Sequence, residues 1–590
     1  MIKIKNMKKN CSLLILIIAA AMNSCDYLDT IPGDAIDNNT FWSTANAAAL
    51  EQYCNLYYPK LIKGHGDPQS WTIGDMINSE YQSDNLLGSA PSIITFGQNT
   101  VLTSNSDWSW SVVRGCNEFL TNYEKSPASI SDKRRYAGEM LFFKAFDYFN
   151  KVKLFGDVPW YDGVLTAESP ELYKGRDSRI LVMDSILSTI NRAIEFLPRK
   201  TAVYRVSRDA ALLLKARICL YEGTYRRYRN IDDDVRFLEE AYAAAGELME
   251  YGYSLYDAAG PENSYFELFI QDDYNANNEI ILSREYDPSI NMGHQVTNSI
   301  PYGELGMSRD CFEEYLCANT GLPISICGCH NPDMGYIAEM KNRDGRLLQT
   351  LCIPEEGNPN ARYLFKDGLG GAPNIFSILP SSETRTFYGA SSTGYAMAKF
   401  YKKEEHLIGN FKGGTDAPVM RYAEVLLIRA EAGAELGKDP ELDKTINKLR
   451  ARVGFPFPLT ENPVEDPNLV KEYPDIKGPN KNLIREIRRE RRIELFAEGY
   501  RWDDVCRWNV GTIVYNKVRR GAKMDPTLYT QDEINTIGDL VGFDQDGFIT
   551  PYAKRATYSM NFTEKNYLYN VPLDEISLNP NLLPNNPGWE

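Results

Sequence analysis

Hydrophobic and polar positions alternate with the period of an α-helix in several long segments of this chain. Between residues 207 and 228, apolar side chains fall near i, i+3, i+4 and i+7, which places them on one helix face. Ser207 stands where an N-cap would begin this helix. The same pattern predicts helices over residues 108–123, 132–153, 178–197, 235–251, 417–436, 442–453 and 482–508, and an alanine-rich amphipathic run to residue 58. The chain is therefore expected to be mainly α.

The predicted helices at 207–228 and 235–251 form a pair with small residues where they would touch. Ala216, Ala241 and Ala245 allow close packing, and the pair resembles a tetratricopeptide helix hairpin. No clean 34-residue period is visible, so any such repeats are degenerate.

Other stretches lack this periodicity. Residues 253–416 break into short apolar segments and long loops, of which 368–395 is especially rich in Gly, Ser, Thr and Pro. Residues 456–479 are punctuated by proline, and the chain is irregular from 525 onward. Loops longer than about fifteen residues are usually functional or disordered.

The first residues have the layout of an export signal. Four lysines precede an uncharged run over residues 13–22, which is too short for the roughly twenty residues that span a bilayer. Met22-Asn23-Ser24-Cys25 follows and looks like a bacterial lipobox, although Met22 stands where Leu is usual. We predict a signal peptide at residues 1–24 and an acylated Cys25, the alternative being a plain signal peptide with a coincidental cysteine.

Charge and composition limit the classes of molecule that the chain is expected to bind. The net charge of −16 makes the chain a poor nucleic-acid partner, because phosphate binding needs clustered Lys and Arg. Tyr (37) outnumbers Phe (24), and tyrosine suits wet surfaces that stack on sugars or peptides. A large helical core that uses many tyrosines is the alternative explanation.

Eleven cysteines include Cys11 in the signal and Cys25, and the other nine show no regular spacing that would indicate a disulfide framework. We expect most of them to be small buried hydrophobic residues. Cys327-Gly328-Cys329-His330 suggests a metal site, but no nearby partner completes a zinc tetrahedron. Asp544-Gln545-Asp546-Gly547 superficially resembles a calcium loop, but Arg555 stands where the bidentate Glu belongs. The sequence thus predicts no metal and no cofactor.

The densest charged segment is residues 485–501. Glu490, Glu494 and Glu498 share one stripe of the predicted helix, and arginines surround them. A glycosidase would need a carboxyl group with a raised pKa, whereas nearby arginines favour the ionised form. We expect a structural ion-pair network here, and we expect no catalytic residues.

Seven blocks of sequence follow one another between residues 25 and 589. The blocks are Cys25-Asp26-Tyr27-Leu28-Asp29 with Phe41-Trp42, Trp110 to Tyr123, Gly138 to Pro159, Asn342-Arg343-Asp344-Gly345-Arg346-Leu347, Met420 to Ala432, Arg488 to Trp508, and Val571 to Trp589. In this order they resemble one family, the SusD/RagB-type outer-membrane lipoproteins of Bacteroidetes glycan-uptake systems, with Gly345 where the family usually has Pro.

The resemblance implies a fold and a role. It implies degenerate tetratricopeptide-like hairpins supporting a loop-rich ligand-binding region, with an N-terminal region at 25–252 and a C-terminal region at 253–590 in one integrated unit. It also implies a lipid-anchored protein on the outer face of the outer membrane. Such a protein captures oligosaccharide as a lid over a SusC-like TonB-dependent transporter and is not an enzyme. The alternatives are a lid that captures peptides or glycoproteins, and a glycoside hydrolase.

Two loop regions hold the candidate ligand residues. Sugar recognition combines a flat aromatic face with a few placed polar groups. The candidates are Trp71, Tyr81 and Asn85 in the first region, and Tyr286, Asn291, His294 and Tyr302 in the second. For Trp71 and Tyr81 the alternative is packing into the core.

The lipid anchor gives a first prediction. Cys25→Ala should leave the protein soluble or unprocessed, because it removes the acylation site on which stable membrane attachment depends. Fractionation and protease shaving of intact cells measure this. A variant that still fractionates with the outer membrane and stays on intact cells would place the anchor elsewhere.

Overall fold

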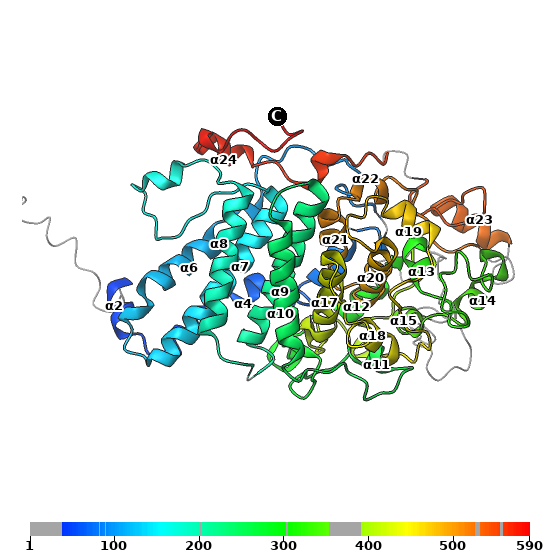
Figure 1. The fold of residues 1–590 in the computed structure, drawn as a ribbon, viewed down its shortest axis with the longest axis horizontal. Coiled ribbons are helices and arrows are strands. Elements are labelled where there is room, and N and C mark those ends of the chain that lie inside the picture. Colours follow the sequence, from blue (N-terminus) through cyan, green and yellow to red (C-terminus); the bar gives the residue numbers. More distant parts are fainter. Residues whose placement is uncertain are drawn as a thin grey trace, which may run out of the picture.

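The computed structural model describes residues 38–590 apart from 82, 89, 201, 303–304, 353–390, 525–530 and 555–558. The predicted signal peptide, Cys25 and most of the glycine-rich stretch at 368–395 lie outside the described residues. The fold is mainly α, as predicted (Figure 1). In the described part of the chain, no helix combines the length and apolar character needed to cross a membrane.

Four long helices, α7 to α10, dominate the first half of the described chain. The helices there are α2 (Asn38–Thr44), α3 (Ala47–Asn55), α4 (Tyr58–Leu61), α5 (Asp75–Tyr81), α6 (Ser111–Asn122), α7 (Ile130–Phe155), α8 (Arg179–Phe196), α9 (Arg208–Arg229) and α10 (Asp234–Met249).

Shorter helices and loops make up the second half. The helices are α11 (Ser264–Glu267), α12 (Val296–Tyr302), α13 (Arg309–Glu314), α14 (Tyr336–Met340), α15 (Gly345–Thr350), α16 (Lys403–Ile408), α17 (Tyr422–Leu436), α18 (Ile446–Arg452), α19 (Pro467–Glu472), α20 (Lys481–Glu494), α21 (Arg501–Arg507), α22 (Gly511–Val514), α23 (Gln531–Leu540) and α24 (Leu573–Leu578). Two antiparallel strand pairs accompany them: β1 (Leu86–Leu87) with β3 (Gly306–Met307), and β2 (Ile280–Arg284) with β4 (Ala417–Arg421).

Successive helices pack side by side. Helix α7 packs on α8, α8 on α9, α9 on α10, α10 on α17 and α17 on α20, so one row links the two halves of the chain (Figure 1). The largest hydrophobic core runs through this row. The shorter helices α14 and α23 lie at the end of the molecule opposite α2 (Figure 1).

Local sequence signals account for the hairpin of α9 and α10. Ser207 caps α9 by accepting a hydrogen bond from the Ala210 N–H, as predicted. Ala216, Ala241 and Ala245 are fully buried. A Cβ at Gly223 would lie 2.7 Å from Leu238 Cγ, so the glycine permits the close approach of the two helices.

Two predicted helices are wrong in their extent. Residues 417–421 form β4 instead of a helical turn, because Pro418 disfavours a helical conformation at the residue before it and the segment pairs with β2. The helix predicted over 482–508 ends at Glu494 and resumes as α21, since Ala497 (φ 63°) and Gly499 (φ 85°) adopt left-handed conformations.

The core of the second half contains charges as well as apolar side chains. Helix α20 is buried from Leu483 to its end at Glu494. Three guanidinium groups converge on the Glu494 carboxylate, at 3.3 Å from Arg346, 2.8 Å from Arg421 and 2.7 Å from Arg452. Against the effect of burial, these arginines lower the pKa of Glu494 to about 2.

Further ion pairs extend this network. They include Arg421 with Glu279 and Glu498, Arg346 with Asp344 and Glu490, Lys399 with Glu498, Arg492 with Asp84, Glu314 and Glu472, Arg501 with Asp84 and Glu472, and Arg507 with Glu431 and Asp504. The structure therefore confirms the predicted structural role of the charged segment 485–501. We call these residues, with Glu494 and Arg452, the buried charge network.

The end of the chain folds back onto the first half. The Tyr569 N–H donates to the Leu154 carbonyl at 2.8 Å, and the Asn586 amide donates to the Phe155 carbonyl at 2.9 Å. Residues near the C-terminus thereby close the end of α7.

The buried charge network predicts a large stability effect for Glu494→Gln. The amide keeps the side-chain volume but removes the charge that three buried arginines share. We therefore expect the free energy of unfolding to fall by about 3–5 kcal/mol. Chemical denaturation followed by circular dichroism measures this. The matched control is Glu239→Gln, because Glu239 pairs with Lys438 at the surface and is 42% exposed. We expect the control to change stability by less than about 1 kcal/mol, and equal effects of the two variants would contradict the account.

The same carboxylate contributes to acid sensitivity. Its pKa falls from 4.5 to about 2 on folding, so the unfolded chain binds the proton more readily between these values. The stabilisation is present above pH 4.5 and is lost as the pH falls toward 2. The Gln variant should therefore lose less stability than the wild type over this interval.

Candidate functional site

Three loops far apart in the sequence meet at one surface. The Gln69 N–H donates to the Gly293 carbonyl at 3.1 Å. His294 and Gly413 exchange two backbone hydrogen bonds, at 3.0 and 3.2 Å. We call residues 64–74, 286–295 and 408–415 the three-loop surface.

A buried aromatic cluster supports this surface from below. The His294 ring lies 4.7 Å from the His65 ring and 4.8 Å from the Tyr286 ring, measured between centroids. All three side chains are buried, and the Tyr286 hydroxyl donates to the Gly66 carbonyl at 2.8 Å. The cluster thus connects the first loop to the second.

His294 is a fixed structural group. Burial lowers its pKa to about 4, so the ring is neutral near pH 7. The Val296 N–H donates to Nδ1, which leaves Nε2 to carry the proton and donate to the Thr415 carbonyl at 2.9 Å. A Cβ at Gly413 would lie 2.4 Å from the ring, so glycine is needed where the third loop crosses it.

The outer face of the three-loop surface is aromatic and apolar. Trp71 is 70% exposed, and its ring meets the half-buried ring of Phe411 edge to face at 4.7 Å. Ile290 and Met292 of the second loop and Ile408 of the third are also exposed. Large apolar side chains that gather at the surface mark sites of interaction.

Amide groups hold the loops together beside these rings. The Gln69 side chain donates to the Asn291 carbonyl at 3.3 Å. The Gln295 amide donates to Asn410 at 2.9 Å and accepts the Phe411 N–H at 2.6 Å. The exposed side chains of Asn291 and Asn410 are available to an outside partner.

The structure brings some of the predicted ligand residues together. Trp71, Asn291, Tyr286 and His294 belong to the three-loop surface, but the Tyr286 and His294 rings lie beneath its outer face. The side chain of Tyr302, at the end of α12, lies outside the described residues.

Tyr81 and Asn85 have internal partners elsewhere. The Tyr81 hydroxyl donates to the Ala90 carbonyl. Asn85 is 1% exposed, donates to Glu80 at 2.6 Å and accepts from Arg492 at 2.7 Å, so it extends the buried charge network. Its polar atoms are already used within the fold.

Sequence reasoning missed Phe411 and its apolar neighbours. Phe411 follows Gly409-Asn410 and precedes Gly413-Gly414, a context that indicates an exposed turn. That local signal was available, but nothing in the sequence joins Phe411 to Trp71.

Carboxyl groups with raised pKa values lie inside the protein. Burial raises the pKa of Glu80, Glu314 and Asp416 to about 7. Each is at most 7% exposed. Glu80 accepts from Asn85, Glu314 lies 3.2 Å from Arg492, and Asp416 accepts from the Tyr204 hydroxyl at 2.9 Å. Because each carboxyl group has a partner inside the protein, its role is structural.

In the candidate calcium loop, the acidic side chains already pair with an arginine. Arg520 lies 2.7 Å from Asp544 and 3.3 Å from Asp546, and the second Asp544 oxygen accepts the Phe548 N–H at 2.9 Å. A cation would have to displace the guanidinium group.

Comparisons with known proteins match nearly the whole chain. The family model described as "SusD family" matches residues 266–589, and the one described as "Starch-binding associating with outer membrane" matches residues 26–220. SusD-like protein P38 of Formosa agariphila is 23% identical, over 85% of this chain and 92% of that protein. SusD-like protein P2 of the same organism is 23% identical, over 81% of this chain and 79% of that protein.

Solved structures show the same fold. A SusD-like carbohydrate-binding protein from Bacteroides fragilis is 25% identical, with a TM-score of 0.71 over 92% of this chain and 100% of that chain. A second SusD-like protein from Bacteroides fragilis is 24% identical, with a TM-score of 0.66 over 95% of this chain and 100% of that chain.

Proposed function

The chain belongs to the SusD family, and from this premise we propose that it captures oligosaccharide at the cell surface through the three-loop surface. The observation that carries the proposal is Trp71, which is 70% exposed and packs edge to face against Phe411 beside the buried cluster of His65, Tyr286 and His294. The family description of starch binding and the carbohydrate-binding relative from Bacteroides fragilis support glycan as the ligand class.

The surface has the chemistry that a sugar ring needs. One face of a pyranose is lined by C–H groups, and covering it with the Trp71 ring removes apolar area from water at about 25 cal/mol per Å². The hydroxyl groups at the ring edge would meet the side chains of Asn291 and Asn410. A pre-ordered aromatic ring loses little conformational freedom on binding, which favours affinity.

We propose binding without catalysis. Glycoside hydrolysis needs two carboxyl groups flanking the scissile bond, one of them protonated. Glu80, Glu314 and Asp416 have suitably raised pKa values, but each is buried and held by internal partners. The exposed Trp71 ring at the three-loop surface is suited to holding a ligand.

An anchor and a transporter complete the proposal. Lipid on Cys25 would hold the chain at the outer membrane, in keeping with the family description of outer-membrane association. The captured glycan would then pass to a SusC-like TonB-dependent transporter, over which this chain acts as a lid. Energy for uptake would come from that partner.

Replacing the exposed Trp71 side chain should weaken glycan binding. We expect Trp71→Ala to lower affinity by about tenfold or more, because losing an aromatic anchor costs on the order of 1–3 kcal/mol. Native gels cast with single polysaccharides, beginning with starch, measure retardation of the mature protein. Thermal stability should be unchanged, since Trp71 is mostly exposed.

The matched control is Phe143→Ala. Phe143 is fully buried in α7, so its loss should lower stability by about 3–5 kcal/mol while the folded fraction keeps its affinity. Full affinity in Trp71→Ala, or a loss explained by unfolding, would refute the site. Retardation by no polysaccharide, together with binding to peptides, would refute the ligand class.

The transporter gives a separate prediction. Affinity-tagged protein extracted from its own cells in mild detergent should carry a large outer-membrane transporter with it. Cys25→Ala serves as the control, because a chain that does not reach the membrane should recover less of the partner. Recovery of this protein alone under several gentle conditions would contradict the lid proposal.

A further inference from the structure

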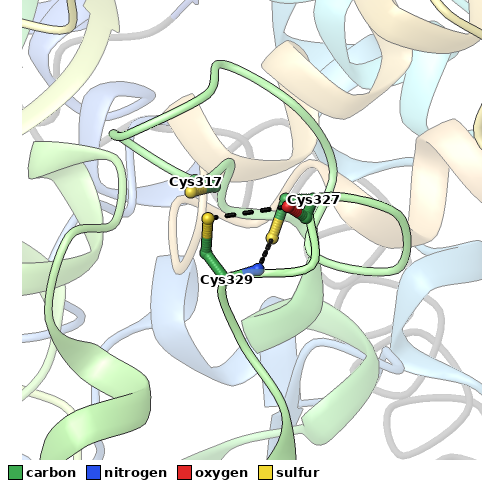
Figure 2. Close-up of side chains that lie close together, drawn as sticks. All are labelled: Cys317, Cys327 and Cys329. Atoms are coloured by element: carbon green, nitrogen blue, oxygen red, sulfur yellow. Dashed lines mark hydrogen bonds between the residues drawn. The ribbon is translucent and has the colours of Figure 1, made fainter.

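Three cysteine side chains meet in a loop that the proposed function does not use. The Sγ atoms of Cys317, Cys327 and Cys329 all lie within 4.8 Å of one another (Figure 2). Cys317 is buried, whereas Cys327 and Cys329 are half-buried and accessible. The sequence suggested no further ligand for the Cys327–Cys329 pair. The fold supplies Cys317, which lies ten positions before Cys327.

The loop backbone fixes the three positions. The Gly321 N–H donates to the Cys317 carbonyl at 2.8 Å, and the Cys317 N–H donates to the Leu322 carbonyl at 3.0 Å. The Cys327 N–H donates to the Pro323 carbonyl at 2.9 Å, which forms the second turn. These hydrogen bonds close one turn after Cys317 and another before Cys327.

Backbone N–H groups point at the sulfurs. The Cys329 N–H donates to Cys327 Sγ at 3.3 Å (Figure 2). The Thr320 hydroxyl and the N–H groups of Asn319 and Thr320 donate to the Cys317 sulfur. Such donors favour the thiolate form, which is the form that binds metal.

We propose that Cys317, Cys327 and Cys329 form a site for a soft divalent metal ion of the zinc class. Thiolates select such ions, and a Zn–S bond of about 2.3 Å places two sulfurs on one tetrahedral ion roughly 3.8 Å apart. The three sulfur atoms already lie within 4.8 Å of one another. On binding, the three thiols release their protons to solvent, and water takes the fourth position.

The site would tie a long loop to the fold. The Ala318 N–H donates to the Asn342 carbonyl at 2.7 Å, so Cys317 already stands on backbone anchored before α15. A metal would join residues 327–329 to that anchor. A disulfide is the competing chemistry at an oxidising cell surface, but it would use two of the three sulfurs and leave one thiol free.

Cadmium titration tests the proposal directly. The mature chain, purified under reducing conditions and freed of metal, should bind one Cd²⁺ per chain and develop the ultraviolet thiolate-to-metal charge-transfer band. Prior loading with Zn²⁺ should raise the Cd²⁺ concentration that is needed to develop the band, because the two ions compete for the same thiolates. The double variant Cys327→Ser/Cys329→Ser should bind about a hundredfold more weakly. The control is Cys219→Ala, which removes a fully buried cysteine outside the cluster and should leave the titration unchanged.

Alkylation of the wild-type protein provides a test that needs no variant. Zn²⁺ should slow iodoacetamide labelling of Cys327 and Cys329 at least tenfold in the folded protein, as judged by peptide mass mapping. An unchanged labelling rate, absence of the charge-transfer band, or a disulfide joining Cys317 to Cys327 or Cys329 in protein isolated without reductant would each overturn the proposal.

Discussion

The rest of the structure depends on satisfying the charges that α20 carries into the interior. Burying an unpaired guanidinium or carboxylate is strongly unfavourable, so each arginine and glutamate of this helix requires a partner at a defined place. The partners come from distant elements: Glu494 meets Arg346, Arg421 and Arg452, while Arg492 meets Asp84. Hydrophobic burial drives collapse without specifying direction, whereas these pairs fix which elements adjoin α20.

The same network positions the three-loop surface. Arg421 ends β4 and binds Glu279, the residue before β2. Strand β2 leads into the loop at 286–295, and the loop at 408–415 leads into β4. Asp84, bound by Arg492 and Arg501, holds the chain that follows the first loop and α5. The buried charges thus hold in place the strands from which two of the three loops extend.

Local features could be predicted from the sequence. Helical periodicity located the long helices, and the Ser207 cap formed as expected because both depend on neighbouring residues. The Glu490, Glu494 and Glu498 stripe indicated a structural network for the same reason. The contacts that define the candidate site depend on tertiary packing, so Asn85 could not be recognised as a partner of Arg492, nor Phe411 as a neighbour of Trp71. The cysteine cluster was missed because Cys317 lies outside the short spacing of a metal-binding pair.

Hydrogen exchange of the mature protein, with and without a retained polysaccharide, tests the central claim most directly. Binding at the three-loop surface predicts slower exchange in residues 64–74, 286–295 and 408–415, with no change in peptides from α8 or α24. Protection confined to other segments, with exchange in all three loops unaltered, would contradict the assignment of this surface as the glycan site.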